Sequence, residues 1–163
     1  MALSIDARRG TRTGRPGVAV PGNVRRTGMS VFSEAEVAYL QSKTMGRLAT
    51  IGVDGRPHLV PLTYCFNAAE DAIDIGGVDF GNTKKWRDML HNPHVAFLVD
   101  DASPAGAHAI EIRGDAEPHV SGGELINPRF PNFTPQFVRV RPHRIVSWGI
   151  QTEGFFPYAR TVC

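Results

Sequence analysis

Long apolar runs are missing from this 163-residue sequence. No stretch approaches the roughly 18 consecutive apolar residues of a membrane-spanning helix, so no membrane partner is expected. Cysteine is also scarce, because the chain has only Cys65 and Cys163. Two such residues make no disulfide framework, and they favour a reduced, cytoplasmic setting. Neither a P-loop nor a Gly-x-Gly-x-x-Gly fingerprint occurs, which argues against the nucleotide sites built on those loops.

Positive charge is concentrated at the N-terminus. Residues 1–28 hold six arginines and one aspartate, a balance of +5, so the rest of the chain carries −3 of the total of +2. This leader is rich in Gly, Pro and Arg and shows no hydrophobic periodicity, so we expect it to be disordered. We interpret it as an upstream extension of the reading frame, with the folded domain over 29–163. The basic character belongs to the leader, so overall charge predicts no nucleic-acid partner.

Short β-patterns dominate the remainder. Ser33 and Glu36 form a capping box that predicts a helix over 33–43. Asp54-Gly55 predicts a hairpin turn between two strands. The predicted strands are 47–53, 58–66, 72–77, 94–101, 107–113 with 115–120, 136–141 and 144–150. Six or seven strands with tight turns predict a mainly β fold, an antiparallel β-barrel with short helices.

The strand over 58–66 is apolar on both faces, so both faces need covering. One face suits the barrel core, and the other needs a ligand or another subunit. Pro61 within it removes a ladder donor. Two interpretations remain open: a simple edge strand, or a local opening beside which a flat ligand lies. The tail with Phe155, Phe156 and Tyr158 is expected to dock on the body or on a partner.

A polar loop after the predicted strand over 72–77 leads into a short helix that stops at Asn92-Pro93. A hydroxyl at Thr83, ammonium groups at Lys84 and Lys85 and free backbone amides at a helix start favour an anion, such as a phosphate. The alternative is a capped helix with solvated lysines.

The six histidines raise the question of a metal site. His91 and His94 flank a helix end, but no cysteine or carboxylate completes a recognisable ligand set. We therefore predict no metal site. His58 is interpreted as an ordinary residue at a strand end.

The order of these pieces resembles the pyridoxamine 5′-phosphate oxidase-like split-barrel family. The resemblance covers about residues 33–150. It is carried by Arg47–Gly52, Asp54–His58, Val60-Pro61, Ile75-Gly76, Thr83–Lys85, Asn92-Pro93, 95–100 and Arg141-Pro142 with Arg144, Ile145 and Trp148. The family implies a homodimer with two flavin or deazaflavin molecules at its interface. The sequence is most similar to the actinobacterial branch that uses coenzyme F420, with FMN as the second choice. The oxidase branch carries arginine and lysine where this chain has Arg56 and then apolar residues, which argues against vitamin B6 oxidase activity.

The resemblance also implies which residues bind the cofactor. The helix start matches the element that grips the cofactor phosphate, one strand lies along the ring system, two glycines lie beside the ring and the ribityl chain, and a late strand reaches in from the other subunit. In that order the residues are Asn82, Thr83, Lys84 and Lys85; Val60, Pro61, Leu62 and Thr63; Gly76 and Gly77; and Trp148.

The function implied is that of an oxidoreductase that transfers a hydride to or from a small organic substrate. The cofactor carries that chemistry, so no catalytic residue is assigned. The alternative is a split-barrel module that binds a flavin, haem or another flat ligand without turnover.

Overall fold

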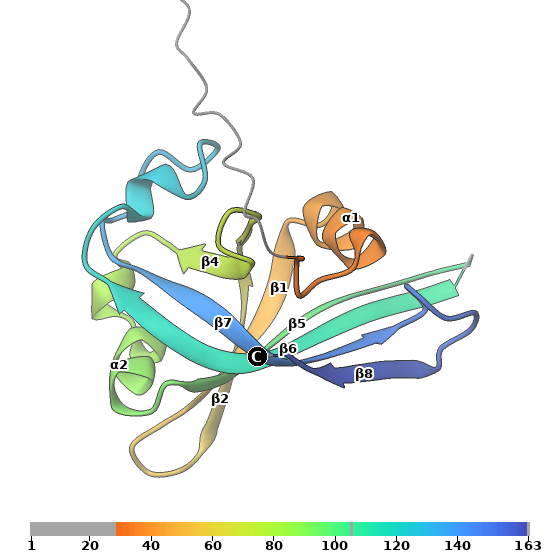
Figure 1. The fold of residues 1–163 in the computed structure, drawn as a ribbon. Helices are drawn as coiled ribbons and strands as arrows, with labels where there is room; N and C mark the ends of the chain where they lie inside the picture. The colour runs from red at the N-terminus through yellow and green to blue at the C-terminus, as the bar shows by residue number, and fades with distance from the viewer. Residues whose placement is uncertain (1–28, 105, 163) are drawn as a thin grey trace, which may run out of the picture.

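The computed structural model describes residues 29–104 and 106–162 (Figure 1). The predicted leader over 1–28 and Cys163 lie outside the described residues. The α-helices are Glu34–Ser42 (α1) and Lys84–His91 (α2), and the 3-10 turns are Phe80–Asn82 (η1) and Gly123–Leu125 (η2). The strands are Met45–Ile51 (β1), Pro57–Thr63 (β2), Cys65–Asn67 (β3), Ala72–Gly76 (β4), His94–Ser103 (β5), Gly106–His119 (β6), Phe137–Trp148 (β7) and Pro157–Thr161 (β8).

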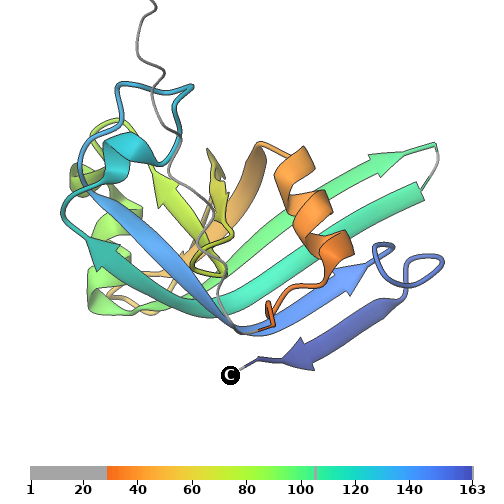
Figure 2. The ribbon, with the colours of Figure 1, turned by 45° about the horizontal axis from the view of Figure 1, so that its top comes forward.

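All eight strands belong to one antiparallel sheet. Its order is β2-β1-β5-β6-β7-β4-β3, and β8 pairs with the last part of β7. The sheet curls into a half-barrel (Figures 1 and 2). β2 and β4 come into contact where it closes. The predicted mainly β, antiparallel barrel class is confirmed. The eighth strand, β8, was not predicted, because its tail reads as an aromatic cluster without alternation.

The two predicted local signals at the start of the domain are confirmed. Ser33 Oγ accepts a hydrogen bond from the Glu36 amide at 3.2 Å, and Glu36 Oε2 accepts one from the Ser33 amide at 3.0 Å. This reciprocal capping satisfies two amides at the start of α1. Gly55 has a φ of +74° and turns β1 into β2, with Ile51 opposite Pro57.

The predicted strand over 58–66 is two strands, and this is a correction. Tyr64 separates β2 from β3. Its ring is buried edge-to-face against Phe97, and its hydroxyl donates to the Leu40 carbonyl at 2.7 Å. Anchoring of Tyr64 in the core bends the chain, so β3 leaves β1 and pairs with β4 instead.

β6 and β7 are each continuous where the sequence predicted two strands. The register between them shifts at Arg113/Gly114, which is a bulge rather than a break. A Cβ on Gly114 would lie 1.8 Å from the Arg141 carbonyl oxygen, so only glycine fits this close approach. The two long strands therefore bend without ending, and they carry the sheet around the barrel.

The core fills the inside of the curl, and its fully buried residues include Leu48, Phe97, Ile110, Ile112 and Ile145. In Figure 2, α1 crosses the open side of the sheet, and α2 lies at the other end, near the β1–β2 hairpin. None of the helices in the described residues is long and apolar enough to cross a membrane.

An ion pair joins the last strand to the first helix. Arg160 in β8 donates to both carboxylate oxygens of Glu36 at 2.9 and 2.5 Å and to the Val31 carbonyl at 2.6 Å. The Glu36 side chain is fully buried. Burial raises the pKa of Glu36, but the hydrogen bonds and charge of Arg160 and the Ser33 amide outweigh it, so the pKa lies below its usual value.

Candidate functional site

The start of α2 offers free backbone donors. Thr83 is the N-cap residue, and its hydroxyl accepts from the Trp86 amide at 3.3 Å while donating to the Phe80 carbonyl at 2.7 Å. The first amides of a helix have no intrahelical partner, and those of Lys84 and Lys85 have none elsewhere in the described chain. The predicted helix start therefore exists, with two amides available to an anion.

Lys84 is not a free cation. Its Nζ donates to both carboxylate oxygens of Asp88 at 2.8 Å, and Asp88 is only 4% exposed. Thr50 Oγ1 donates to the same carboxylate at 2.9 Å. Burial of Asp88 opposes its ionisation, but the hydrogen bonds from Lys84 and Thr50 outweigh burial and hold its pKa below the usual value.

Lys85, unlike Lys84, has no carboxylate partner among the described residues. Its side chain is partly buried, and its Nζ lies 5.1 Å from the centroid of the Phe80 ring. Burial lowers the pKa of Lys85, and no carboxylate pairs with it in the described ranges. A partly desolvated ammonium gains by pairing with an anion. Lys85 therefore fits the role of a phosphate ligand.

Asn82 holds the turn before the helix. Its side-chain amide donates to Asp79 Oδ1 at 2.6 Å, and its carbonyl accepts from Arg87 at 2.7 Å. Asp79 has a positive φ of 52°. These contacts fix the loop that leads from β4 to Thr83, so Asn82 shapes the helix start.

The strand predicted to lie along a ring, Val60–Thr63, belongs to β2 at one end of the sheet. Val60 and Leu62 pack against the core, while Leu59 (63% exposed) and Pro61 face outward. Pro61 stands opposite Arg47 in an unbroken register. The edge-strand interpretation of Pro61 agrees with this position at the end of the strand path, and a flat ligand beside Pro61 stays a prediction.

Gly76 and Gly77 lie beneath the chain's own 121–135 segment. A Cβ on Gly76 would lie 3.2 Å from Phe133 and 3.3 Å from Ile126. Thr134 fixes that segment, because its amide donates to the Gly77 carbonyl at 3.0 Å and its hydroxyl accepts from the Phe80 amide at 3.1 Å. The 121–135 segment is thus attached directly to the loop that leads to α2.

Trp148 lies apart from the other predicted residues. It ends β7 and stacks on Phe155 with a centroid distance of 6.1 Å. This end of β7 and α2 lie at opposite ends of the molecule in both views (Figures 1 and 2). Within one chain, η1 joins the end of β4 to the start of α2, β2 contacts β4, and Trp148 lies outside that group.

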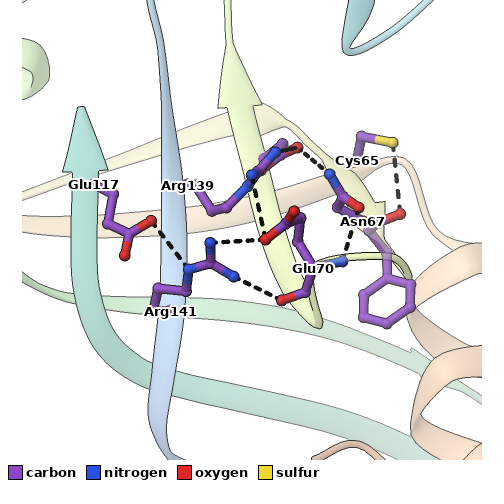
Figure 3. Close-up of polar contacts among 8 residues, drawn as sticks. Cys65, Asn67, Glu70, Glu117, Arg139 and Arg141 are labelled. Carbon is purple, nitrogen blue, oxygen red and sulfur yellow. Dashed lines mark hydrogen bonds and ion pairs between the residues drawn. The ribbon is translucent and has the colours of Figure 1, made fainter. Parts of the chain in front are cut away.

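Sequence reasoning missed the polar cluster on β3, β4 and β7. Arg139 donates to both oxygens of Asp74 at 2.7 and 2.9 Å, and Asn67 donates to Asp74 at 2.8 Å. Figure 3 shows Arg141 between Glu117 and Glu70, and its guanidinium donates a hydrogen bond to each of these carboxylates. The available signal was Asp74, a charge inside an otherwise apolar strand.

Beside this cluster lies a pocket of about 480 Å³. Cys65, Phe66 and Leu125 line it, and Phe137 is stacked against His119 at 4.4 Å. Burial raises the pKa of the Cys65 thiol. The pocket is therefore lined by both apolar and polar groups, and the Asp74–Arg139 ion pair forms part of its wall.

A half-barrel sheet that closes beside a cationic helix start defines a split-barrel protein. The family model for pyridoxamine 5′-phosphate oxidase matches residues 32–145. The chain belongs to this family.

A curated relative from Streptomyces rimosus is the 5a,11a-dehydrotetracycline/5a,11a-dehydrooxytetracycline reductase. It is 37% identical over 125 residues, which cover 75% of this chain and 86% of the relative. Among solved structures, General Stress Protein 26 from Bacillus anthracis has a TM-score of 0.60 at 18% identity and covers 79% of this chain and 97% of its own. An FMN-binding protein from Nostoc punctiforme has a TM-score of 0.58 at 13% identity. The match covers 83% of this chain and 100% of that protein. These two structures are similar in fold.

Proposed function

We propose that this protein is an oxidoreductase that binds coenzyme F420, or else FMN, and transfers a hydride to a small organic substrate. The observation that carries the proposal is the 37% identity to a reductase over most of both chains. Only the class of reaction is extended to this chain. A bound deazaflavin or flavin would supply the hydride chemistry.

The residues present fit a cofactor with a phosphate. Lys85 provides a partly buried cation without a carboxylate partner, and the amides of Lys84 and Lys85 point out of the helix start. Charge-assisted hydrogen bonds to such an anion each contribute about 1.5–3 kcal/mol. The outward face of β2, with Leu59 and Pro61, offers an exposed apolar surface.

Spectroscopy of the purified protein tests the proposal. After incubation with FMN, coenzyme F420 or haem and removal of free ligand, we expect F420 or FMN to be retained with micromolar affinity. Reduced cofactor should then be oxidised when a quinone or an enone is added. Failure to retain either flavin-type cofactor contradicts the proposal, and retention of haem alone supports the alternative of a non-catalytic binding module.

We also propose a homodimer with the cofactor at the interface. The outward face of β1 and β2 exposes Met45 (52%) and Leu59 (63%), and exposed apolar surface of this kind marks interaction sites. Leu59→Glu should shift the protein from dimer to monomer in analytical ultracentrifugation and weaken cofactor retention. Leu90→Glu is the matched control, because Leu90 is equally exposed (58%) on α2. A dimer unaffected by Leu59→Glu would show that β2 lies outside the interface.

A further inference from the structure

The two adjacent lysines at the start of α2 differ in their surroundings. Lys84 is held at 2.8 Å by both oxygens of Asp88. Lys85 turns toward the Phe80 ring and pairs with no carboxylate among the described residues. The sequence does not distinguish the two lysines, whereas the fold gives an ion-pair partner to Lys84 and none among the described residues to Lys85.

Polar groups from α2, β1 and β2 converge on Asp88. Thr50 on β1 donates to it at 2.9 Å, and His58 on β2 places Nδ1 3.5 Å from its Oδ2. That His58 nitrogen is buried and makes no hydrogen bond to any described residue. Lys84 is the cation that neutralises the carboxylate, because its Nζ donates to both oxygens of Asp88 whereas His58 Nδ1 makes no hydrogen bond to it.

The backbone below also makes room for Lys84. A Cβ on Gly52 would lie 3.1 Å from Lys84 Nζ and 2.8 Å from Asp54 Oδ1. The Lys84 ammonium is therefore directed back over the end of β1, between Asp88 and the β1–β2 turn. Its position is set by groups from three elements: α2, β1 and the turn.

We propose that Asp88 is a positioning residue of the anion site, which fixes and neutralises Lys84 and so leaves Lys85 as the cation that binds the cofactor phosphate. This inference rests on the proposed function, since it assigns roles within the same site. A lysine whose charge is matched by a buried carboxylate attracts a second anion weakly, because the carboxylate repels that anion over nearly the same distance. Lys85 has no such opposing charge.

Cofactor affinity in three variants tests this division. Lys85→Met should weaken binding of FMN and coenzyme F420 by about tenfold or more, the loss of one charge-assisted hydrogen bond. Replacement of the ion pair by apolar groups, in Lys84→Met with Asp88→Leu, should change affinity by less than about threefold, because no net charge is removed. Asp88→Asn should tighten binding by about threefold and steepen its dependence on salt, because Lys84 is released.

Thermal melting shows whether each variant is folded, and the salt dependence separates a positioning role from a purely structural one. A purely structural Asp88 would give a lower melting temperature without tighter binding, which would overturn the inference. Equal losses in Lys85→Met and in the double variant would overturn it as well.

A measurement without cofactor separates this inference from the proposed function. In NMR spectra of the full chain, inorganic pyrophosphate should move the Lys85 Cε signal and leave that of Lys84 nearly unchanged. If the wild type binds neither FMN nor F420, the proposed function fails while this result still decides the roles of the lysines. Equal movement of both signals would contradict the division.

Discussion

Replacement of Arg160 by leucine is expected to lower the free energy of unfolding by about 3 kcal/mol, since it leaves a buried carboxylate without its cation. Arg160 supplies two hydrogen bonds to the fully buried Glu36 and one to the Val31 carbonyl. Urea denaturation followed by circular dichroism measures the loss, and the melting temperature should fall by roughly 10 °C. The expected effect is large because the pair joins the two ends of the described chain.

Arg144→Leu is the matched control for this variant. Arg144 lies on β7 beside β8, but it is exposed and reaches only Thr161 at 3.4 Å, so its replacement should leave stability within about 0.5 kcal/mol. Similar losses in both variants would show that the Glu36 pair contributes no more than a surface arginine.

Acid pH should shrink the effect of Arg160→Leu. The pKa of Glu36 in the folded wild type is depressed, so its contribution to stability is present above the unfolded pKa and is lost as pH falls through the folded pKa. Without Arg160 the buried carboxyl takes up a proton more readily. The gap between wild type and variant should therefore narrow below about pH 4.

Gly114→Ala is expected to have the second large effect. It should lower the free energy of unfolding by about 3 kcal/mol or more, at the upper end of the range for overpacked cores. The new methyl group would lie 1.8 Å from the Arg141 carbonyl oxygen and 2.7 Å from its carbon. Both are backbone atoms of β7, so relief requires the bulge to shift. Urea denaturation measures the loss.

Gly77→Ala serves as the control for a glycine with ordinary room, since its Cβ would lie 3.4 Å from Phe80. It should change stability by less than about 1 kcal/mol. Equal stability of Gly114→Ala and Gly77→Ala would contradict this prediction. It would show that the bulge between β6 and β7 can shift without lowering the free energy of unfolding.

Local signals predicted most of the secondary structure. The Ser33–Glu36 box and the Asp54-Gly55 turn are determined by neighbouring residues, and both formed as expected. The end of β2 at Tyr64 depends on a hydroxyl contact with Leu40, 24 residues away, which no local pattern contains. The joining of two predicted strands into β6 and into β7 likewise depends on pairing across the sheet.

The candidate site also has features that neighbouring residues predict and features that depend on distant contacts. Thr83 as an N-cap followed from the sequence, because capping acts over three residues. The partner of Lys84 did not, because no local pattern in α2 predicts that Asp88 is buried. The structure buries Asp88 together with Trp86 and Met89 on α2. A charged residue becomes a core residue only when distant groups such as Thr50 satisfy it.

The two ends of the main strand path also limit how copies of this chain associate. β2 carries Pro61, which lacks an amide donor, and β3 has only three residues. Edge strands with proline or of such short length are poor templates for the addition of another strand. Contacts between copies along these two ends are therefore disfavoured, and growth of the sheet into fibrous aggregates is disfavoured with them. At these two ends, self-association is left to the faces of the sheet, where side chains rather than backbone groups select the partner.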